Sequence, residues 1–237
     1  MKKVEKIAIL SCLIMSSSVA QEVSLKFFNN LDIVESGGIK VTKYQELDNI
    51  YHLKGEPLLS QGQKKPFEFF LTKNFKQIIL GRAIDSKTQA EVKFKPNKEY
   101  LEALKGAEAL SYGTGKEVIY VFTDPECPYC KKFEKKLPSL KDKYTFKVFM
   151  FPLSFHQNAK QMSRYIMAGE TQEVKFDRML EVANDLTTYK RYKGTTEENQ
   201  RLNREIEKQI KLGTDVEING TPVAMKPDGT MLNWPDL

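Results

Sequence analysis

The chain has few cysteines and histidines, the residues that form structural zinc sites. Its 237 residues include only 3 cysteines and 2 histidines, and the histidines are His52 and His156. A structural zinc ion needs about four ligands, and these residues do not stand at the spacing of a zinc finger. We therefore expect no metal site and no cofactor.

Long hydrophobic runs and blocks of basic residues are also missing. The apolar stretch Ile7 to Met15 is shorter than the roughly 20 residues that span a bilayer, and no second stretch approaches that length. The net charge is only +6, and no basic block is interleaved with aromatic residues, so nucleic acid is not an expected partner. With 41% hydrophobic residues the composition is that of a globular protein, which excludes collagen, a coiled-coil rod and a multispan membrane protein.

The first 20 residues have the layout of a secretory signal. A basic start at Lys2 to Lys6 is followed by the apolar stretch Ile7 to Met15 and by a small-residue site at Ser18 to Ala20. We predict cleavage near Ala20 and export of residues 21–237. An uncleaved N-terminal anchor is the alternative.

Cleavage would remove Cys12 and leave two cysteines, Cys127 and Cys130, in an exported chain. Exported proteins commonly use distant cysteines as structural crosslinks. A pair separated by two residues closes too small a loop to restrict the unfolded chain much. An inert structural disulfide stays an alternative, but the spacing favours a reactive pair.

The surroundings of this pair predict a strand that leads into a helix. Val118 to Phe122 is a continuous β-branched and aromatic run, typical of a strand buried on both faces. Pro128 fits the first position of a helix, which makes Cys127 the N-cap and Cys130 the third helical residue. The helix N-terminus and the lysines within residues 131–136 both favour a thiolate at Cys127. We expect an exposed nucleophile at Cys127, a sheltered resolving thiol at Cys130, and dithiol–disulfide exchange.

Patterns elsewhere predict a small α+β unit followed by an α/β unit. In the first unit a helical start at 25–31 precedes a four-stranded antiparallel sheet. Its strands are expected at 38–43, 49–53, 67–71 and 77–80. In the second unit we expect a strand at 145–151, helices at 159–168, 174–182 and 197–212, and a hairpin within 221–232. The helix expected at 97–111 either joins the units or begins the second one.

Two local signals concern the later part of the chain. Thr195 and Glu198 are placed as a capping box for the helix at 197–212, and Gly213 is expected at its end. His156 follows a strand and is expected to be a loop residue rather than a catalytic base.

Several of these segments resemble one known family. Phe122 to Cys130, with the sequence FTDPECPYC, is similar to the active-site stretch of the periplasmic thioredoxin-fold disulfide isomerases of the DsbC/DsbG type. Gly220-Thr221-Pro222 resembles their cis-proline loop, and Gly81 to Asp85 resembles the end of their N-terminal dimerisation domain. The resemblance covers almost all of residues 21–237 in segment order.

For the fold, the resemblance implies a homodimer built from two domains. An α+β dimerisation domain of the cystatin-like type is expected at 21–95, followed by a linker helix at 96–113. An α/β thioredoxin-fold catalytic domain is expected at 114–237, with a helical insertion at about 155–213.

For the function, the resemblance implies a periplasmic protein disulfide isomerase or reductase. Cys127 would attack a substrate disulfide, and Cys130 would resolve the mixed disulfide. The residues expected to face the substrate are Pro128, Tyr129, Thr221 and Pro222. The implied partners are unfolded or misoxidised periplasmic proteins and a DsbD-like membrane electron donor. A thiol oxidase of the DsbA/DsbG kind and a dimeric periplasmic chaperone are the alternatives.

The sequence departs from the family in two places. Val121 stands six positions before Cys127, where cytoplasmic thioredoxins carry a buried Asp, and this argues against a dedicated thioredoxin-like reductase. The sequence stops at Leu237, soon after Trp234-Pro235, so the closing helix of the domain is expected to be absent or reduced.

Overall fold

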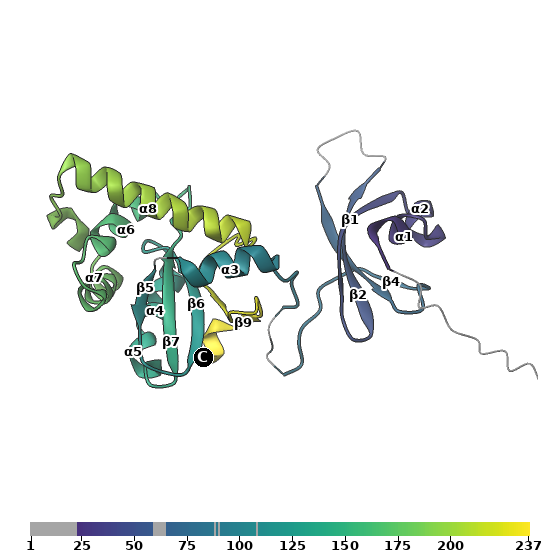
Figure 1. Cartoon of the computed structure of the whole chain (residues 1–237), viewed down its shortest axis with the longest axis horizontal. Coiled ribbons are helices and arrows are strands. Elements are labelled where there is room, and N and C mark those ends of the chain that lie inside the picture. The colour runs from purple at the N-terminus through teal and green to yellow at the C-terminus, as the bar shows by residue number, and fades with distance from the viewer. Residues whose placement is uncertain (1–22, 59–64, 88, 90, 108) are drawn as a thin grey trace, which may run out of the picture. The chain divides into compact units, whose positions relative to one another are not determined.

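The computed structural model describes residues 23–58, 65–87, 89, 91–107 and 109–237. The expected signal sequence, residues 1–20, lies outside this part of the chain. Two compact units meet in the sequence at Gly81 and Arg82 (Figure 1). None of the described helices is long and apolar enough to cross a membrane.

The first unit is a four-stranded antiparallel sheet with two short helices against it (Figure 1). The strands lie side by side in the order β1-β2-β3-β4. The elements are α1 Leu25–Asn29, α2 Asp32–Ser36, β1 Ile39–Glu46, β2 Ile50–Pro57, β3 Phe67–Thr72 and β4 Ile78–Ile79. Phe28 and Val34 bring the helices onto the sheet, where they are buried with Leu53 and Phe69. The predicted strands are confirmed, whereas α2 was missed because five residues are too few to show a helical period.

The second unit contains a five-stranded mixed sheet with the strand order β5-β7-β6-β8-β9. Strands β6 and β7 are parallel, and the other neighbours are antiparallel. Its strands are β5 Leu110–Tyr112, β6 Glu117–Thr123, β7 Tyr144–Met150, β8 Val223–Met225 and β9 Met231–Leu232. Its α-helices are α3 Lys98–Gly106, α4 Pro128–Glu134, α5 Leu137–Leu140, α6 Ala159–Met167, α7 Gln172–Asn184 and α8 Thr196–Asp215, and its 3-10 helices are η1 Thr188–Arg191 and η2 Trp234–Asp236.

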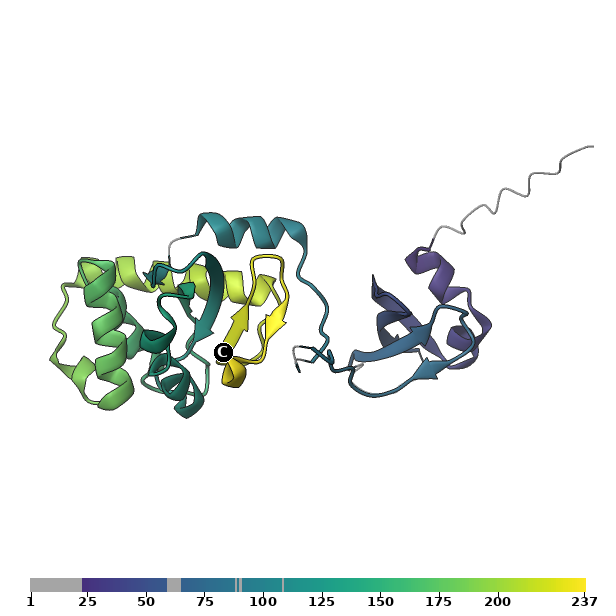
Figure 2. The ribbon, with the colours of Figure 1, turned by 90° about the horizontal axis from the view of Figure 1, so that it is seen from below.

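Strand β6 is central and buried on both faces, as its apolar run predicts. Ile119 and Val121 belong to a cluster that includes Phe133 of α4 and residues of α6 and α7. Tyr120 and Phe122 belong to a second cluster, on the face where α3 and α8 run along the sheet (Figure 2). Helices thus cover both faces, which holds the carboxyl end of β6 at a fixed place.

The helix expected to link the two units belongs to the second unit. Leu101 and Leu104 of α3 are buried in the same cluster as Tyr120 and Phe122, because the apolar face of this helix needs a partner surface. Strand β5 also lies within the expected linker 96–113. The boundary between compact units therefore falls after Gly81, not after residue 95.

Helix α8 begins as predicted but ends later. The Thr195 hydroxyl accepts a hydrogen bond from the Glu198 N–H at 3.2 Å. Gly213, expected at the end of the helix, lies inside it and is buried. A Cβ atom at this position would be 2.5 Å from Cε2 of Phe151, so the glycine permits close approach of α8 to the strand end.

The last residues pack against the helix that carries the cysteines. After β9 the chain forms η2, and the ring of Trp234 lies 5.5 Å from the ring of Phe133. Lys136 Nζ donates to the carbonyl oxygen of Pro235 at 2.8 Å. These contacts cover part of the α4 side of the sheet.

Candidate active site

Cys127 and Cys130 lie where β6 ends and α4 begins. Cys127 is the N-cap of α4, with an extended backbone (φ −69°, ψ 125°), and Pro128 is the first helical residue. Cys130 is consequently the third residue of the helix, as predicted. Since the first N–H groups of a helix have no partner within the helix, they point toward the Cys127 end.

The two sulfurs differ in their surroundings. Cys130 is fully buried, and its Sγ accepts a hydrogen bond from the Asp124 N–H at 3.4 Å. Cys127 keeps 6% of its surface exposed, so the expectation of an openly exposed nucleophile is wrong, because the surrounding loops cover most of the residue. Both cysteines are free. Pro128 and Tyr129, which are expected to face the substrate, are both exposed, and Tyr129 is 60% exposed.

The environment makes Cys127 the more acidic thiol. The pKa of Cys127 is lowered to about 5, and the largest cause is a hydrogen bond from the Cys130 thiol. Burial opposes this change, and the backbone N–H groups of Cys130 and Tyr129 support it. The helix N-terminus thus acts as expected, whereas the lysines of residues 131–136 are not among the causes. Burial raises the pKa of Cys130, and its hydrogen bond to Cys127 raises it further.

The Thr221–Pro222 segment, between α8 and β8, meets the cysteines. Its peptide bond is cis. The Cys127 thiol donates to the carbonyl oxygen of Thr221 at 3.6 Å. The Thr221 hydroxyl oxygen is buried, and the Thr221 side chain lowers the pKa of both cysteines. The structure therefore brings together all four of Cys127, Cys130, Thr221 and Pro222.

A fully buried carboxylate, Asp124, was not predicted as part of the site. Its oxygens accept hydrogen bonds from the Leu153 N–H at 2.7 Å, from His156 Nδ1 at 2.8 Å and from the Glu126 N–H at 2.8 Å. His156 is a loop residue, as expected, but it is paired with this carboxylate. Through these hydrogen bonds the Asp124 carboxylate connects the loop after β7 to the turn that carries Cys127. The sequence feature that could have indicated this role is the position of Asp124, an acidic residue directly after a buried apolar strand.

A second buried acid, Glu134, was also missed. It is 1% exposed, and its Oε1 accepts a hydrogen bond from the Thr123 hydroxyl at 2.6 Å. The available signal was its place four residues after Cys130 on the same helix. No group of three or more described His, Cys, Asp or Glu residues is arranged to hold a metal ion.

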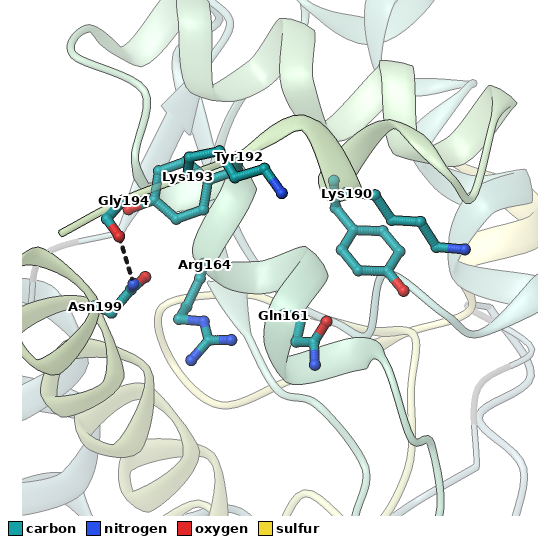
Figure 3. A pocket seen from close by; sticks show the side chains of 8 residues that line it. Gln161, Arg164, Lys190, Tyr192, Lys193, Gly194 and Asn199 are labelled. Atoms are coloured by element: carbon teal, nitrogen blue, oxygen red, sulfur yellow. Dashed lines mark hydrogen bonds between the residues drawn. The ribbon is translucent and has the colours of Figure 1, made fainter. Parts of the chain in front are cut away.

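A cavity of about 420 Å³ lies beside α6, η1 and the start of α8 (Figure 3). Arg164, Lys190 and Lys193 make its lining basic, and Asn199 Nδ2 donates to the Gly194 carbonyl at 2.9 Å. Neither cysteine lines it. The cavity is therefore separate from the cysteine pair.

Comparisons with known proteins agree with this geometry. A family model described as a thioredoxin-like domain matches residues 104–235. A curated protein of Bordetella avium, named "Probable thiol:disulfide interchange protein DsbC", is 26% identical over 169 residues, which cover 68% of this chain and 56% of the relative. The chain thus spans a little over half the length of that relative.

Two solved structures have weaker likeness. The thiol-disulfide exchange protein α-DsbA2 of Wolbachia pipientis has a TM-score of 0.49 at 14% identity, covering 58% of this chain and 88% of that one. DsbG of Helicobacter pylori has a TM-score of 0.43 at 15% identity, covering 82% of this chain and 97% of that one.

The family match and the curated relative confirm the resemblance to thiol:disulfide proteins of the DsbC/DsbG type. Since the family model matches more than half of the sequence, this chain belongs to the thioredoxin-like domain family.

Proposed function

We propose that this protein is a periplasmic thiol–disulfide oxidoreductase that rearranges or reduces the disulfides of other exported proteins. One observation carries the proposal: a thiol of lowered pKa, Cys127, caps a helix directly beside a buried second thiol, Cys130. Helix N-termini that stabilise a thiolate in this way are typical of reactive cysteines. The signal-like start of the sequence and the DsbC-like relative support the periplasm as its location.

The reaction begins with the Cys127 thiolate. It attacks one sulfur of a substrate disulfide, forms a mixed disulfide, and releases the other substrate sulfur as a thiolate. At about pH 7 a thiol with a pKa of about 5 is mostly ionised, so the nucleophile is ready without a separate base.

The mixed disulfide has two fates. If another substrate thiolate attacks it, the substrate leaves with a rearranged disulfide and Cys127 is regenerated. If Cys130 attacks the Cys127 sulfur, the substrate leaves reduced and the protein keeps a Cys127–Cys130 disulfide, which a DsbD-like membrane donor would reduce. We assign substrate contact to Thr221, Pro222, Pro128 and Tyr129, because they lie at or beside Cys127, the cysteine of the pair that keeps some exposed surface.

Oxidase activity is the second candidate. The groups that lower the pKa of Cys127 stabilise the reduced dithiol, and a stabilised reduced form makes its disulfide a stronger oxidant. We favour isomerisation because the curated relative is of the DsbC type and because an N-terminal unit precedes the thioredoxin-like one.

We assign that N-terminal unit to dimerisation, in the manner of a cystatin-like domain. Strand β4 is an edge of its sheet, and edge strands present unpaired backbone groups to other chains. Ile79 of β4 is 47% exposed and the following Leu80 is 72% exposed, so an apolar surface continues this edge. A second copy of the chain would cover the β4 edge and these two apolar side chains.

The direct test uses the chain from Gln21 and two forms of ribonuclease. With scrambled ribonuclease, an isomerase restores activity, and Cys127→Ser abolishes this effect. With reduced ribonuclease and a limiting amount of oxidised protein, an oxidase instead transfers its own disulfide. Equal recovery with and without the wild-type protein in both assays would contradict exchange, and suppression of aggregation that survives Cys127→Ser would favour a chaperone.

A further inference from the structure

The basic cavity beside α6 and η1 has no part in the exchange steps above. Its volume of about 420 Å³ lies within the roughly 300–1,000 Å³ that is usual for ligand sites. Arg164, Lys190 and Lys193 line it, and none of the eight described residues around it is acidic (Figure 3). Gln161 and the two lysines are exposed, so the cavity opens at the surface. It is therefore accessible to a ligand from outside.

The cations of this cavity lack the acidic partners that neighbouring lysines have. Within the described part of the chain, none of Arg164, Lys190 and Lys193 forms an ion pair. By contrast, Lys160, which is in α6 like Arg164, pairs with Glu207 of α8 at 2.5 Å. A cleft lined by charges of one sign concentrates ligands of the opposite sign. The cavity therefore favours a ligand with negative charge.

Glu198 lies near one wall of the cavity, but cations act on the same wall. Burial raises the pKa of Tyr192, and Glu198 raises it further. Arg164 and Arg178 lower the same pKa, so two guanidinium groups oppose the one carboxylate there. Arg164 Nη1 donates to Asn203 Oδ1 at 3.5 Å, and this contact does not exhaust a guanidinium, which has five N–H donors. Arg164 can therefore also bind a ligand.

Hydrogen bonds connect the cavity to the turn that carries Cys127. The hydroxyl of Tyr189, a lining residue, donates to Asn158 Oδ1 at 3.0 Å. Asn158 donates its N–H to Glu126 Oε2 at 2.7 Å, and Glu126 directly precedes Cys127. Asn158 is also the N-cap of α6, and Arg164 lies about 9 Å further along that helix. These steps place the cavity within roughly 20 Å of the reactive sulfur.

We propose that this basic cavity binds acidic side chains of the protein substrates, so that disulfides with an acidic segment nearby react faster. This rests on the proposed exchange function and names a class of substrate for it. An extended chain rises about 3.3 Å per residue, so an acidic segment about six residues from the substrate cysteine reaches the cavity while its sulfur meets Cys127. The Arg164 guanidinium suits a carboxylate, because the two groups can form parallel hydrogen bonds.

Two peptides that differ in charge test the proposal with the reduced chain from Gln21. Each has one cysteine linked to thionitrobenzoate and, about six residues away, a segment of either glutamate or glutamine. Attack of the Cys127 thiolate on the peptide sulfur forms the mixed disulfide and releases thionitrobenzoate, whose absorbance gives the rate constant. The glutamate peptide should react roughly 5-fold to 10-fold faster. This preference should disappear in about 1 M salt, which screens the charges.

Variants distinguish this cavity from the general charge of the protein. Lys190→Gln combined with Lys193→Gln removes two positive charges from the cavity and should bring the two rate constants close together. The matched control combines Arg204→Gln with Lys208→Gln, which removes two positive charges from exposed residues of α8 outside the cavity. The control should keep the wild-type preference. Because each variant is measured with both peptides, a general loss of activity cancels in the ratio.

A binding measurement separates an acidic chain from a free anion as the ligand. A fluorescent glutamate peptide without cysteine should bind the oxidised chain, as measured by anisotropy, and the Lys190 and Lys193 variant should bind it roughly 5-fold more weakly. Inorganic phosphate is titrated separately, with its binding followed by calorimetry. Binding of phosphate without binding of the peptide assigns the cavity to a free anion and overturns the proposal.

The outcomes separate this inference from the proposed function. Equal rate constants for the two peptides in the wild-type chain, with normal release of thionitrobenzoate, overturn the inference and leave exchange intact. The inference is also wrong if the control variant loses the preference as fully as the Lys190 and Lys193 variant. Absence of release from both peptides overturns the proposed exchange, and the anisotropy measurement then decides whether the cavity binds acidic chains.

Discussion

The Sγ of Cys127 lies 3.6 Å from the carbonyl oxygen of Thr221, although 94 positions separate the two residues. One belongs to the junction of β6 and α4, and the other to the connection between α8 and β8. Because β6 and β8 are neighbours in the sheet, their pairing brings these segments together. The reactivity of Cys127 therefore depends on the fold of the whole second unit as well as on its own helix.

The first prediction concerns the acidity of Cys127. Its rate of alkylation by iodoacetamide should be constant above about pH 6 and fall as the pH drops through about 5, where the thiolate becomes protonated. Because the pKa is lower in the folded state than in the unfolded state, the reduced protein should lose stability relative to Cys127→Ser as the pH falls from about 8.5 to about 5. An alkylation midpoint near 8.5 would contradict the assignment of the nucleophile.

The second prediction concerns the buried hydroxyl of Thr221. Thr221→Val removes a group that lowers the pKa of Cys127, so the alkylation midpoint should move to higher pH while exchange continues. Thr221→Ser keeps the hydroxyl and serves as the matched control. If the valine and serine variants have the same midpoint, the hydroxyl does not act on the sulfur.

The third prediction concerns the Asp124 carboxylate. Asp124→Ala leaves the N–H groups of Leu153 and Glu126 without their acceptor, and the free energy of unfolding should fall by about 2 kcal/mol or more. Urea denaturation followed by circular dichroism measures this change. Asp185→Ala removes an exposed carboxylate that bonds only to nearby Thr187, and should change stability by no more than about 0.5 kcal/mol. Equal effects of the two variants would count against the stabilising role of Asp124.

The fourth prediction concerns assembly. Light scattering should find the chain from Gln21 to be a dimer, and Leu80→Lys should weaken the dimer because it adds charge to an apolar surface. A fragment that starts at Arg82 should be monomeric, and it keeps α3, whose Leu101 and Leu104 belong to the second core. A monomeric chain from Gln21 at micromolar concentration would refute the dimer.

Local patterns were sufficient for much of the fold. The apolar run of β6, the proline after Cys127 and the capping pair Thr195 and Glu198 each express short-range physical constraints, and the structure has the predicted elements there. Strand β5 was missed because three residues show no period, so the stretch was read as a continuation of α3. Gly213 was predicted to end the helix, but a glycine is needed there because the position lies against Phe151. That contact could not be predicted, since Phe151 lies far away in the sequence.

In the candidate site, too, local motifs could be predicted and contacts between distant residues could not. Cys127, Cys130 and Thr221-Pro222 stand in motifs that can be recognised in one segment of sequence. Asp124 and Glu134 are defined by their burial and by hydrogen-bond partners in other segments, and their positions in the sequence indicate neither property. The valine at position 121 indicated that β6 lacks a buried acid, whereas the structure has one that comes from α4.

Trapping of the mixed disulfide tests the central claim most directly. Cys130→Ser, which cannot resolve the intermediate, should accumulate a covalent adduct with scrambled ribonuclease, visible on a non-reducing gel. Peptide mass spectrometry should locate this adduct at Cys127, and Cys127→Ser should form none. If both variants form adducts equally, or if neither does, Cys127 is not the attacking nucleophile and the proposed exchange mechanism is wrong.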